Sequence, residues 1–466
     1  MRSFDHFLDL ALAQDTLPAI LQGDQVSSFG DLLIQAKRLS AELAACGVGR
    51  GRPVVVAKAN GADVAAAVVA AWMHESQPVF VSPHAPPHHL EHAIKVSNAA
   101  AVLTDAGLVA SGNPVVPHDE LDAEIGSVVF TSGSTGTPKG VMQRHDTLLL
   151  GAQRIQRLLG LCVTDRICCP VPWSHDYGWG QLLNCLLCGI PLVLPSHPGV
   201  QGLSDAIERH KPTVLAGTPA LFAGMCFGVS NIREADLCSV RRITSTGSRL
   251  APELVADMLE LFPNAQIFAN YGLTETYRTC CLLPQDRKGR EASVGRPIEG
   301  CQVTIVDQDG RLVASGTRGD VVHHGAGAFA GYLGDPQKTA DTKIGPNSVK
   351  TGDVGYLDSD GFLFLVGRKD RMVKSMDVQV SLDEIEALLG STGLTRQVAV
   401  ISTEHQMLGR QVEAYVVLKD PEDKRALKAF ARQLLSKYQL PRVFHFVTVI
   451  AETPSGKINY PALCDA

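Results

Sequence analysis

The sequence predicts an α/β protein with largely parallel sheets. Short runs rich in β-branched residues alternate with longer helical patterns over most of the chain, which is typical of strand–helix–strand units. ADVAAAVVAAWMH and APELVADMLELF predict two of the helices. Nine runs predict buried strands: RPVVVAKA, QPVFVS, AAVLTD, GSVVFTS, RICCPVPW, PLVLPS, PTVLAGTP, RRITSTG and QIFANYG.

The chain is long enough for more than one domain. It has 466 residues, 45% of them hydrophobic, so we expect a large core spread over two or three domains. After about residue 290 the pattern changes, and CQVTIVDQDGRLV predicts a hairpin through its Asp-Gly turn. In SLDEIEALL, Ser381 and the Glu three residues later form a capping box, and DKRALKAFARQLLSKY is amphipathic. We place a boundary at Lys369–Asp370, with a large domain over residues 1–369 and a small α+β domain over residues 370–466.

Composition excludes several classes of protein. The net charge is −6, so the chain has no basic footprint for nucleic acid. Its 12 cysteines lack metal-ligand spacing and are expected to be free thiols in a reducing cytosol. No signal-peptide pattern and no apolar run of about 20 residues occur, so we expect a cytoplasmic protein without a membrane segment. His88 and His92 have a spacing that can bind zinc on a helix, but no third ligand follows at a set spacing, and no metal site is expected there.

The stretch FTSGSTGTPKG (Phe130–Gly140) follows a predicted strand and contains hydroxyl side chains, glycines and one lysine. A Walker A loop would need Lys followed by Ser or Thr, whereas Lys139 is followed by Gly140. Two interpretations remain from the residues: a flexible surface turn, or an anion cradle of backbone N–H groups and hydroxyls at a ligand-binding strand end. The loop alone does not decide between them.

Three further stretches, with this loop, resemble the adenylate-forming enzymes. They are NYGLTET (Asn270–Thr276), KTGDVGYLDSDGFLFLVGRKD (Lys350–Asp370) and ETPSGKINY (Glu452–Tyr460). The superfamily includes acyl-CoA synthetases, adenylation domains of nonribosomal peptide synthetases and beetle luciferases. The resemblance implies a large domain of α/β subdomains with a small β-barrel-like part, followed by a small domain on a hinge at Asp370. It also implies that a carboxylate attacks the α-phosphate of ATP, and that a thiol then displaces AMP.

The resemblance assigns roles to the motif residues. Thr274 contacts the α-phosphate, Glu275 holds Mg²⁺ and Asp353 accepts from the ribose hydroxyls. Arg368 lies beside the ribose and phosphate, and Lys457 bridges carboxylate and phosphate oxygens during adenylation. The remaining nucleotide-binding residues are Thr131, Ser132, Gly133, Ser134, Thr135, Gly136, Lys139 and Tyr271.

The acyl pocket is expected around PVPWSHDYGWGQLL, with His175 at the aromatic gate position and Asp176 next to it. In members that activate amino acids, an Asp near this position pairs with the substrate ammonium, but fatty-acyl members also carry His-Asp here. Gly247, Asn270 and Gly272 are expected to line the same pocket. HDYG with YGLTETYR is similar to stand-alone ligases that load acyl or aminoacyl groups onto carrier proteins.

Departures after the hinge concern the second step. The family usually has Asp, Gly and Pro where this chain has Arg371, Asp377 and Leu382. That Gly lies on the loop facing the active site during thiol transfer, so Asp377 brings a side chain and a charge to the thiol passage. We expect an acid–thiol ligase that uses a carrier protein or CoA. The alternatives are transfer of the adenylate to an amine or hydroxyl, and a non-catalytic binding scaffold; the intact set of motif residues argues against the scaffold.

Overall fold

The structure is a computed structural model that describes residues 2–113, 116–131, 138–228, 232–375, 378–405, 409–452 and 458–464. The chain divides into two compact units, residues 1–303 with 323–349 and residues 304–322 with 350–466. We call them the first and the second unit. Asp370 belongs to the second unit, and its role as a hinge remains a prediction.

A seven-stranded sheet forms one layer of the first unit, in the order β18-β8-β7-β4-β3-β5-β6. The four central strands are parallel, and the outer strands pair antiparallel. The strands are β3 (Val54–Ala57), β4 (Pro78–Phe80), β5 (Ala101–Thr104), β6 (Gly107–Ala110), β7 (Ile125–Thr131), β8 (Lys139–Arg144) and β18 (Gly331–Tyr332).

A nine-stranded sheet forms a second layer of this unit, in the order β15-β14-β13-β12-β11-β9-β10-β1-β2. Six neighbouring strands, from β13 to β1, run parallel. The strands are β1 (Pro18–Gln22), β2 (Gln25–Ser28), β9 (Ile167–Cys168), β10 (Leu192–Leu194), β11 (Val214–Gly217), β12 (Arg242–Ser245), β13 (Gln266–Tyr271), β14 (Cys280–Leu282) and β15 (Arg296–Pro297). All nine predicted strands are therefore present, and the predicted α/β class is confirmed.

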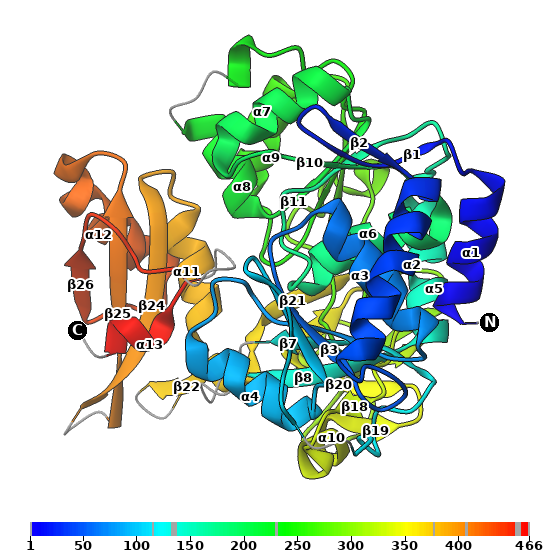
Figure 1. Cartoon of the computed structure of the whole chain (residues 1–466). Coiled ribbons are helices and arrows are strands. Elements are labelled where there is room, and N and C mark those ends of the chain that lie inside the picture. The colour runs from blue at the N-terminus through cyan, green and yellow to red at the C-terminus, as the bar shows by residue number, and fades with distance from the viewer. Residues whose placement is uncertain are drawn as a thin grey trace. The chain divides into compact units, whose positions relative to one another are not determined.

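Helices cover both faces of each sheet, which explains the continuous apolar runs of the strands. Successive side chains of a strand point to opposite faces, so Val54 and Val56 enter the core that contains α3 (Ala62–Met73), while Val55 enters the core under α4 (Pro87–Ser97). The core with α3 also contains α1 (Ser3–Ala13), α2 (Phe29–Ala45), α5 (His145–Leu159) and α6 (Asp176–Cys188) (Figure 1). Helices α7 (Gly199–His210), α8 (Pro219–Phe227) and α9 (Pro252–Leu261) cover the other face of the nine-stranded sheet.

A five-stranded sheet has the order β16-β17-β20-β19, with β21 also paired to β20. Its strands are β16 (Cys301–Val306), β17 (Gly319–Gly325), β19 (Lys343–Gly345), β20 (Ser348–Leu357) and β21 (Leu363–Arg368). The Asp-Gly turn forms, because Gly310 N–H donates to the Asp307 carbonyl. The predicted hairpin forms in part: Val306 and Leu312 form an isolated bridge and Val313 N–H donates to the Ile305 carbonyl, but the described residues after the turn form no full strand and β16 pairs with β17 in the sheet.

The rest of the second unit is α+β. A hairpin of β22 (Met372–Ser375) and β23 (Val378–Ser381) precedes a three-stranded sheet of β24 (Thr395–His405), β25 (Gly409–Leu418) and β26 (Val443–Phe446). Helices α11 (Leu382–Gly390) and α12 (Lys424–Leu434) bury their apolar faces against that sheet, and α13 (Tyr460–Cys464) packs on β24 (Figure 1). Ser381 caps α11 by accepting a hydrogen bond from Glu384 N–H, as predicted. The other half of the predicted capping box differs, because the Glu384 carboxylate accepts from Arg318 and Gln439.

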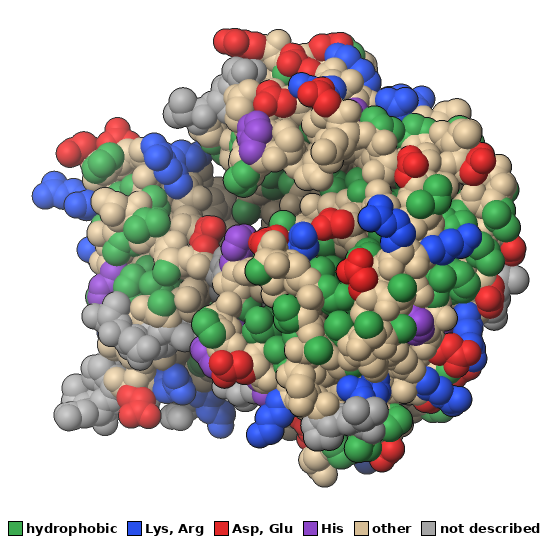
Figure 2. All heavy atoms as spheres, viewed as in Figure 1, with side chains coloured by type: hydrophobic (Ala, Val, Ile, Leu, Met, Phe, Trp, Pro, Cys, Tyr) green, Lys and Arg blue, Asp and Glu red, His purple; other side chains and the backbone are tan. Residues whose placement is uncertain are grey.

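On the face seen in Figure 2, acidic and basic side chains of the first unit are interspersed and no large basic patch is formed.

The first unit also contains the short helix α10 (Pro336–Thr342). Within the described ranges, none of the helices has the length and apolarity needed to cross a bilayer.

Candidate active site

Most of the predicted site residues of the first unit follow strands of the two sheets or begin α6. Thr131 ends β7, Tyr271 ends β13, and Asp176 begins α6. In α/β proteins the carboxyl ends of parallel strands are the usual place for a ligand. These residues are far apart in the sequence, but their positions at strand ends and at the start of α6 point to one candidate site.

The Phe130–Gly140 stretch joins β7 to β8, and Thr131 pairs directly with Lys139 across that hairpin. Ser132, Gly133, Ser134, Thr135 and Gly136 lie outside the described residues. Lys139 Nζ lies 5.8 Å from the centre of the Tyr332 ring, and the Tyr332 hydroxyl donates a 2.6 Å hydrogen bond to Glu275. The structure thus joins the predicted phosphate-binding lysine and the predicted metal-binding carboxylate through Tyr332.

The loop that carries Thr274 and Glu275 is held by a backbone bond from Phe329 and by the side chain of Thr276. Phe329 N–H donates to the Glu275 carbonyl at 2.9 Å, and Leu273 N–H donates to Thr276 Oγ1 at 3.1 Å. At Gly272 a Cβ would lie 2.9 Å from Arg278 Cα, so only glycine lets the chain turn here. The Glu275 carboxylate is half-buried and one oxygen receives the Tyr332 hydroxyl, which leaves oxygen acceptors of the kind that Mg²⁺ prefers.

Asp176 is held at the first turn of α6 by Gln143. Gln143 Oε1 accepts from Ser127 Oγ at 2.9 Å and from Trp179 Nε1 at 3.1 Å, so its amide nitrogen must face the other way. That nitrogen donates a 2.7 Å hydrogen bond to Asp176. Burial raises the pKa of Asp176 to about 7, although the Gln143 hydrogen bond and the charge of Arg278 both favour the carboxylate. His175 caps α6, since its Nδ1 accepts from Tyr177 N–H at 3.1 Å.

Asn270 connects the ends of β12 and β13. Its Nδ2 donates to Thr244 Oγ1 at 2.7 Å and to the Ser245 carbonyl at 3.1 Å. Thr246 Oγ1 donates back to the Asn270 carbonyl at 3.2 Å. The next residue, Gly247, has φ +99°, which a side chain would strain. Asn270 thus fixes the start of the loop that carries Gly247.

In the second unit, β20 pairs with β21 so that Asp353 lies opposite Arg368. Asp353 is buried, and its Oδ1 is 3.5 Å from Arg368 Nη1. Arg368 Nη1 also donates to the Thr351 carbonyl at 3.4 Å. Lys457 and Asp377 lie outside the described residues, so their predicted roles remain predictions.

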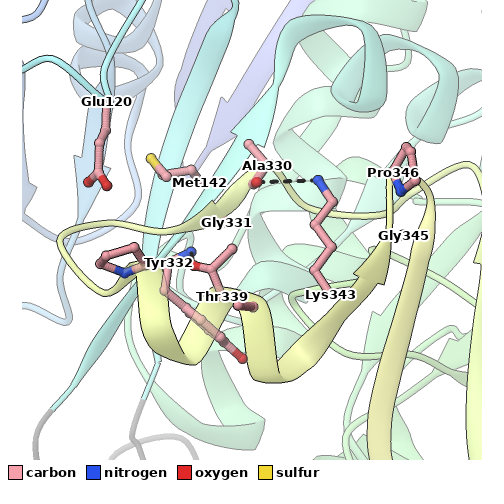
Figure 3. A pocket seen from close by; sticks show the side chains of 11 residues that line it. Glu120, Met142, Ala330, Gly331, Tyr332, Thr339, Lys343, Gly345 and Pro346 are labelled. Atoms are coloured by element: carbon pink, nitrogen blue, oxygen red, sulfur yellow. Dashed lines mark hydrogen bonds between the residues drawn. The ribbon is translucent and has the colours of Figure 1, made fainter.

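A pocket of about 440 Å³ lies between β18, α10 and β19 (Figure 3). Lys343 Nζ donates to the carbonyls of Phe329 (2.8 Å) and Ala330 (3.3 Å), and burial lowers its pKa. Tyr332 N–H donates to Thr339 Oγ1 at 2.9 Å. These bonds hold the strand from which Tyr332 reaches Glu275, so we interpret the residues around this pocket as support for the site.

Sequence reasoning missed Gln143, Tyr332 and Arg278. Gln143 is a buried polar residue that directly follows the apolar pair Val141–Met142 in β8, and this was a usable signal. Tyr332 gave no signal, because its contact with Glu275 joins residues 57 positions apart.

Two family models match the chain. The model of the AMP-binding enzyme matches residues 11–127 and 114–333, and the model of the AMP-binding enzyme C-terminal domain matches residues 384–457. Among curated proteins, the chain is 25% identical to 2-succinylbenzoate–CoA ligase of Bacillus subtilis (strain 168), over 96% of this chain and 95% of that protein. It is 27% identical to tyrocidine synthase 3 of Brevibacillus parabrevis, over 96% of this chain but 7% of that longer protein.

Solved structures share the fold over nearly the whole chain. The O-succinylbenzoate coenzyme A synthetase of Bacillus subtilis in complex with ATP and a magnesium ion has a TM-score of 0.87 at 24% identity, covering 100% of both chains. An amide bond synthetase of Marinactinospora thermotolerans has a TM-score of 0.86 at 25% identity, covering 99% of both chains.

Proposed function

Because this chain belongs to the AMP-binding enzyme family of adenylate-forming enzymes, we propose that it activates a carboxylic acid with ATP and Mg²⁺ and transfers the acyl group to a thiol. The observation that supports this best is the group formed by Lys139, Tyr332 and Glu275. Glu275 shares its loop with Thr274, the residue that precedes it. It combines a cation, a half-buried carboxylate and a hydroxyl, which suit phosphates and a metal ion.

In the first step, an oxygen of the acid forms a bond to the α-phosphorus of ATP while the bond to the pyrophosphate oxygen breaks. Negative charge moves onto the phosphate oxygens, so the protein must supply fixed donors and cations. We assign the leaving pyrophosphate to the Thr131–Lys139 loop and the α-phosphate to Thr274. Lys457 contributes the cation that contacts both reactants.

Mg²⁺, when bound by Glu275, neutralises charge on the phosphates. The Tyr332 hydroxyl orients the Glu275 carboxylate through its hydrogen bond. In the second unit, Asp353 and Arg368 bind the ribose side of the nucleotide, and Asp353 is the acceptor for the ribose hydroxyls.

In the second step, a thiolate attacks the acyl carbonyl and AMP leaves. We propose a carrier-protein phosphopantetheine as the acceptor in preference to CoA, because Asp377 adds a carboxylate where the family has glycine. CoA carries an anionic nucleotide that this carboxylate repels within about 8 Å at physiological salt, whereas a carrier arm lacks it. The test offers CoA and a phosphopantetheinylated carrier side by side and detects thioester by mass spectrometry. Thioester on the carrier supports the proposal, and efficient acyl-CoA formation contradicts it.

The second candidate is transfer of the acyl group to an amine, favoured by the likeness to an amide bond synthetase. Its signature in the same assay is amide formation without thioester on either acceptor.

The acid is an amino acid if Asp176 pairs with an ammonium. Asp176→Asn should then weaken an amino-acid substrate far more than its deaminated analogue, because Asn keeps the shape and loses the charge. Equal losses for the two substrates would mean that Asp176 only shapes the pocket.

A further inference from the structure

Arg278 is a buried cation without a carboxylate partner. The residue is 6% exposed, and its Nη1 atom is buried without a hydrogen-bond partner. The described residues place no carboxylate within 4 Å of its guanidinium. Among the described residues, the guanidinium instead faces the ring of Tyr177, whose centre lies 5.2 Å from Arg278 Cζ.

This arrangement is costly in the free protein. A guanidinium does not lose its proton, so it cannot escape burial by becoming neutral, and contact with an aromatic face compensates only part of the lost hydration. Asp176 is close enough to interact electrostatically with Arg278, but the two side chains form no ion pair. A negative group that enters from outside would complete the pairing.

Arg278 also lies where an acid should bind. It follows Thr274 by four residues, and its ring partner Tyr177 is adjacent to Asp176. The Tyr177 hydroxyl donates to the Thr244 carbonyl at 2.6 Å, which fixes the ring at the end of β12.

Further buried polar atoms without partners occur on the same segments. They are Tyr277 Oη, Asn270 Oδ1 and Ser245 Oγ. Tyr277 also has φ +57°, an uncommon conformation for a bulky residue that is often found at ligand sites. Asn270 Nδ2 and the Tyr177 hydroxyl both form hydrogen bonds with Thr244 Oγ1, so the unsatisfied Asn270 Oδ1 lies near the ring partner of Arg278. This indicates polar rather than apolar surroundings for the Arg278–Tyr177 pair.

We propose that Arg278 receives a second anionic group of the acid, so that the substrate class is carboxylic acids carrying a further carboxylate. This deepens the function proposed above and rests on it. The second carboxylate pairs with Arg278 while the first reacts at the α-phosphate. The proposal holds whether or not the acid also carries an ammonium near Asp176.

The experiment measures ATP–pyrophosphate exchange by the full-length chain with pairs of acids that differ in one terminal carboxylate. Suitable pairs are adipate with hexanoate, isophthalate with benzoate, and glutamate with norvaline. We expect the dicarboxylate to be preferred in at least one pair by about 10-fold or more in kcat/KM. Arg278→Gln should reduce kcat/KM for that dicarboxylate by about 100-fold, and reduce kcat/KM for the monocarboxylate of the pair far less. Arg278→Lys should restore part of the loss, since it keeps the charge.

Arg52 offers a matched control. It is 7% exposed and also has buried guanidinium atoms without partners, but it precedes β3 and so lies at the amino end of that strand. Arg52→Gln should leave the ratio between the two acids of a pair unchanged. The proposal would be overturned if every pair showed a preference for the monocarboxylate. It would also be overturned if Arg278→Gln lowered kcat/KM equally for both acids of a pair.

Binding of the preferred dicarboxylate without ATP separates this inference from the proposed function. If no acid supports exchange but calorimetry detects adipate, isophthalate or glutamate binding that Arg278→Gln abolishes, the reaction is wrong and the subsite stands. If no dicarboxylate binds but a monocarboxylate supports exchange, the subsite is wrong and the proposed function stands. If no acid of either class binds or supports exchange, both proposals fail.

Discussion

The guanidinium of Arg371 stacks on Tyr460, with 3.8 Å between Arg371 Cζ and the ring centre. Arg371 also forms ion pairs with Asp383 and Glu386, and the Tyr460 hydroxyl donates to Glu386 at 2.9 Å. The residue after the predicted hinge is thereby joined to helix α13, which follows the segment that carries Lys457. Arg371 stands at the position where the adenylate-forming pattern has Asp, and in this chain it contacts both α11 and α13.

Replacement of Arg371 should destabilise the second unit. Its side chain is 16% exposed, and Arg371→Met would leave Asp383 and Glu386 without their cation. We expect a loss of about 3 kcal/mol in the free energy of unfolding, measured by urea denaturation. Arg311→Met is the control, because that side chain is 76% exposed in its pair with Asp309 and should change stability by less than about 0.5 kcal/mol. Equal effects of the two variants would mean that the Arg371 cluster contributes nothing.

Lys457→Ala should remove adenylation while the protein stays folded. It deletes a cation that acts in the transition state, so pyrophosphate exchange should fall by about 100-fold or more. Preformed acyl-adenylate supplied to the same variant should still be converted in the second step. Exchange within a fewfold of the unmodified protein would refute the role of Lys457.

Tyr332→Phe should weaken the response to magnesium. The variant keeps the ring beside Lys139 and loses the hydrogen bond to Glu275. Because hydrogen bonds behind a metal ligand commonly change metal affinity by about 10-fold or more, the Mg²⁺ concentration for half-maximal exchange should rise by a similar factor. Tyr356→Phe, whose ring stacks on Phe364 in the second unit, should not alter it.

Asp176 should make stability depend on pH. Its pKa is raised by burial to about 7 in the folded protein, against 3.8 for the free side chain. Between these values the folded state binds more protons than the unfolded state, so the stability linked to this group is present at low pH and is lost as the pH rises through 7. Asp176→Asn should therefore flatten the decline in stability between about pH 4 and 7, whereas Glu253→Gln, at an exposed position of α9, should not. An unchanged decline in Asp176→Asn would show that the carboxyl is already ionised.

The strands were predictable because their signal is local. Runs such as PTVLAGTP show the apolar pattern of strands that are covered on both faces, and β11 lies there. The hairpin predicted around Asp307 forms only in part, since local turn chemistry does not reveal that β16 has another partner in its sheet. Within the site, the motif loops were predictable, but the bonds of Gln143 to Ser127, Trp179 and Asp176 depend on packing between distant segments.

We expect this chain to join a carboxylic acid to AMP. The most direct measurement is exchange of labelled pyrophosphate into ATP by the full-length protein over a panel of carboxylic and amino acids, because it needs no acceptor. We predict exchange that depends on one class of acid and on Mg²⁺, and that is lost in Lys457→Ala. Binding of ATP without exchange for any acid in the panel would contradict it.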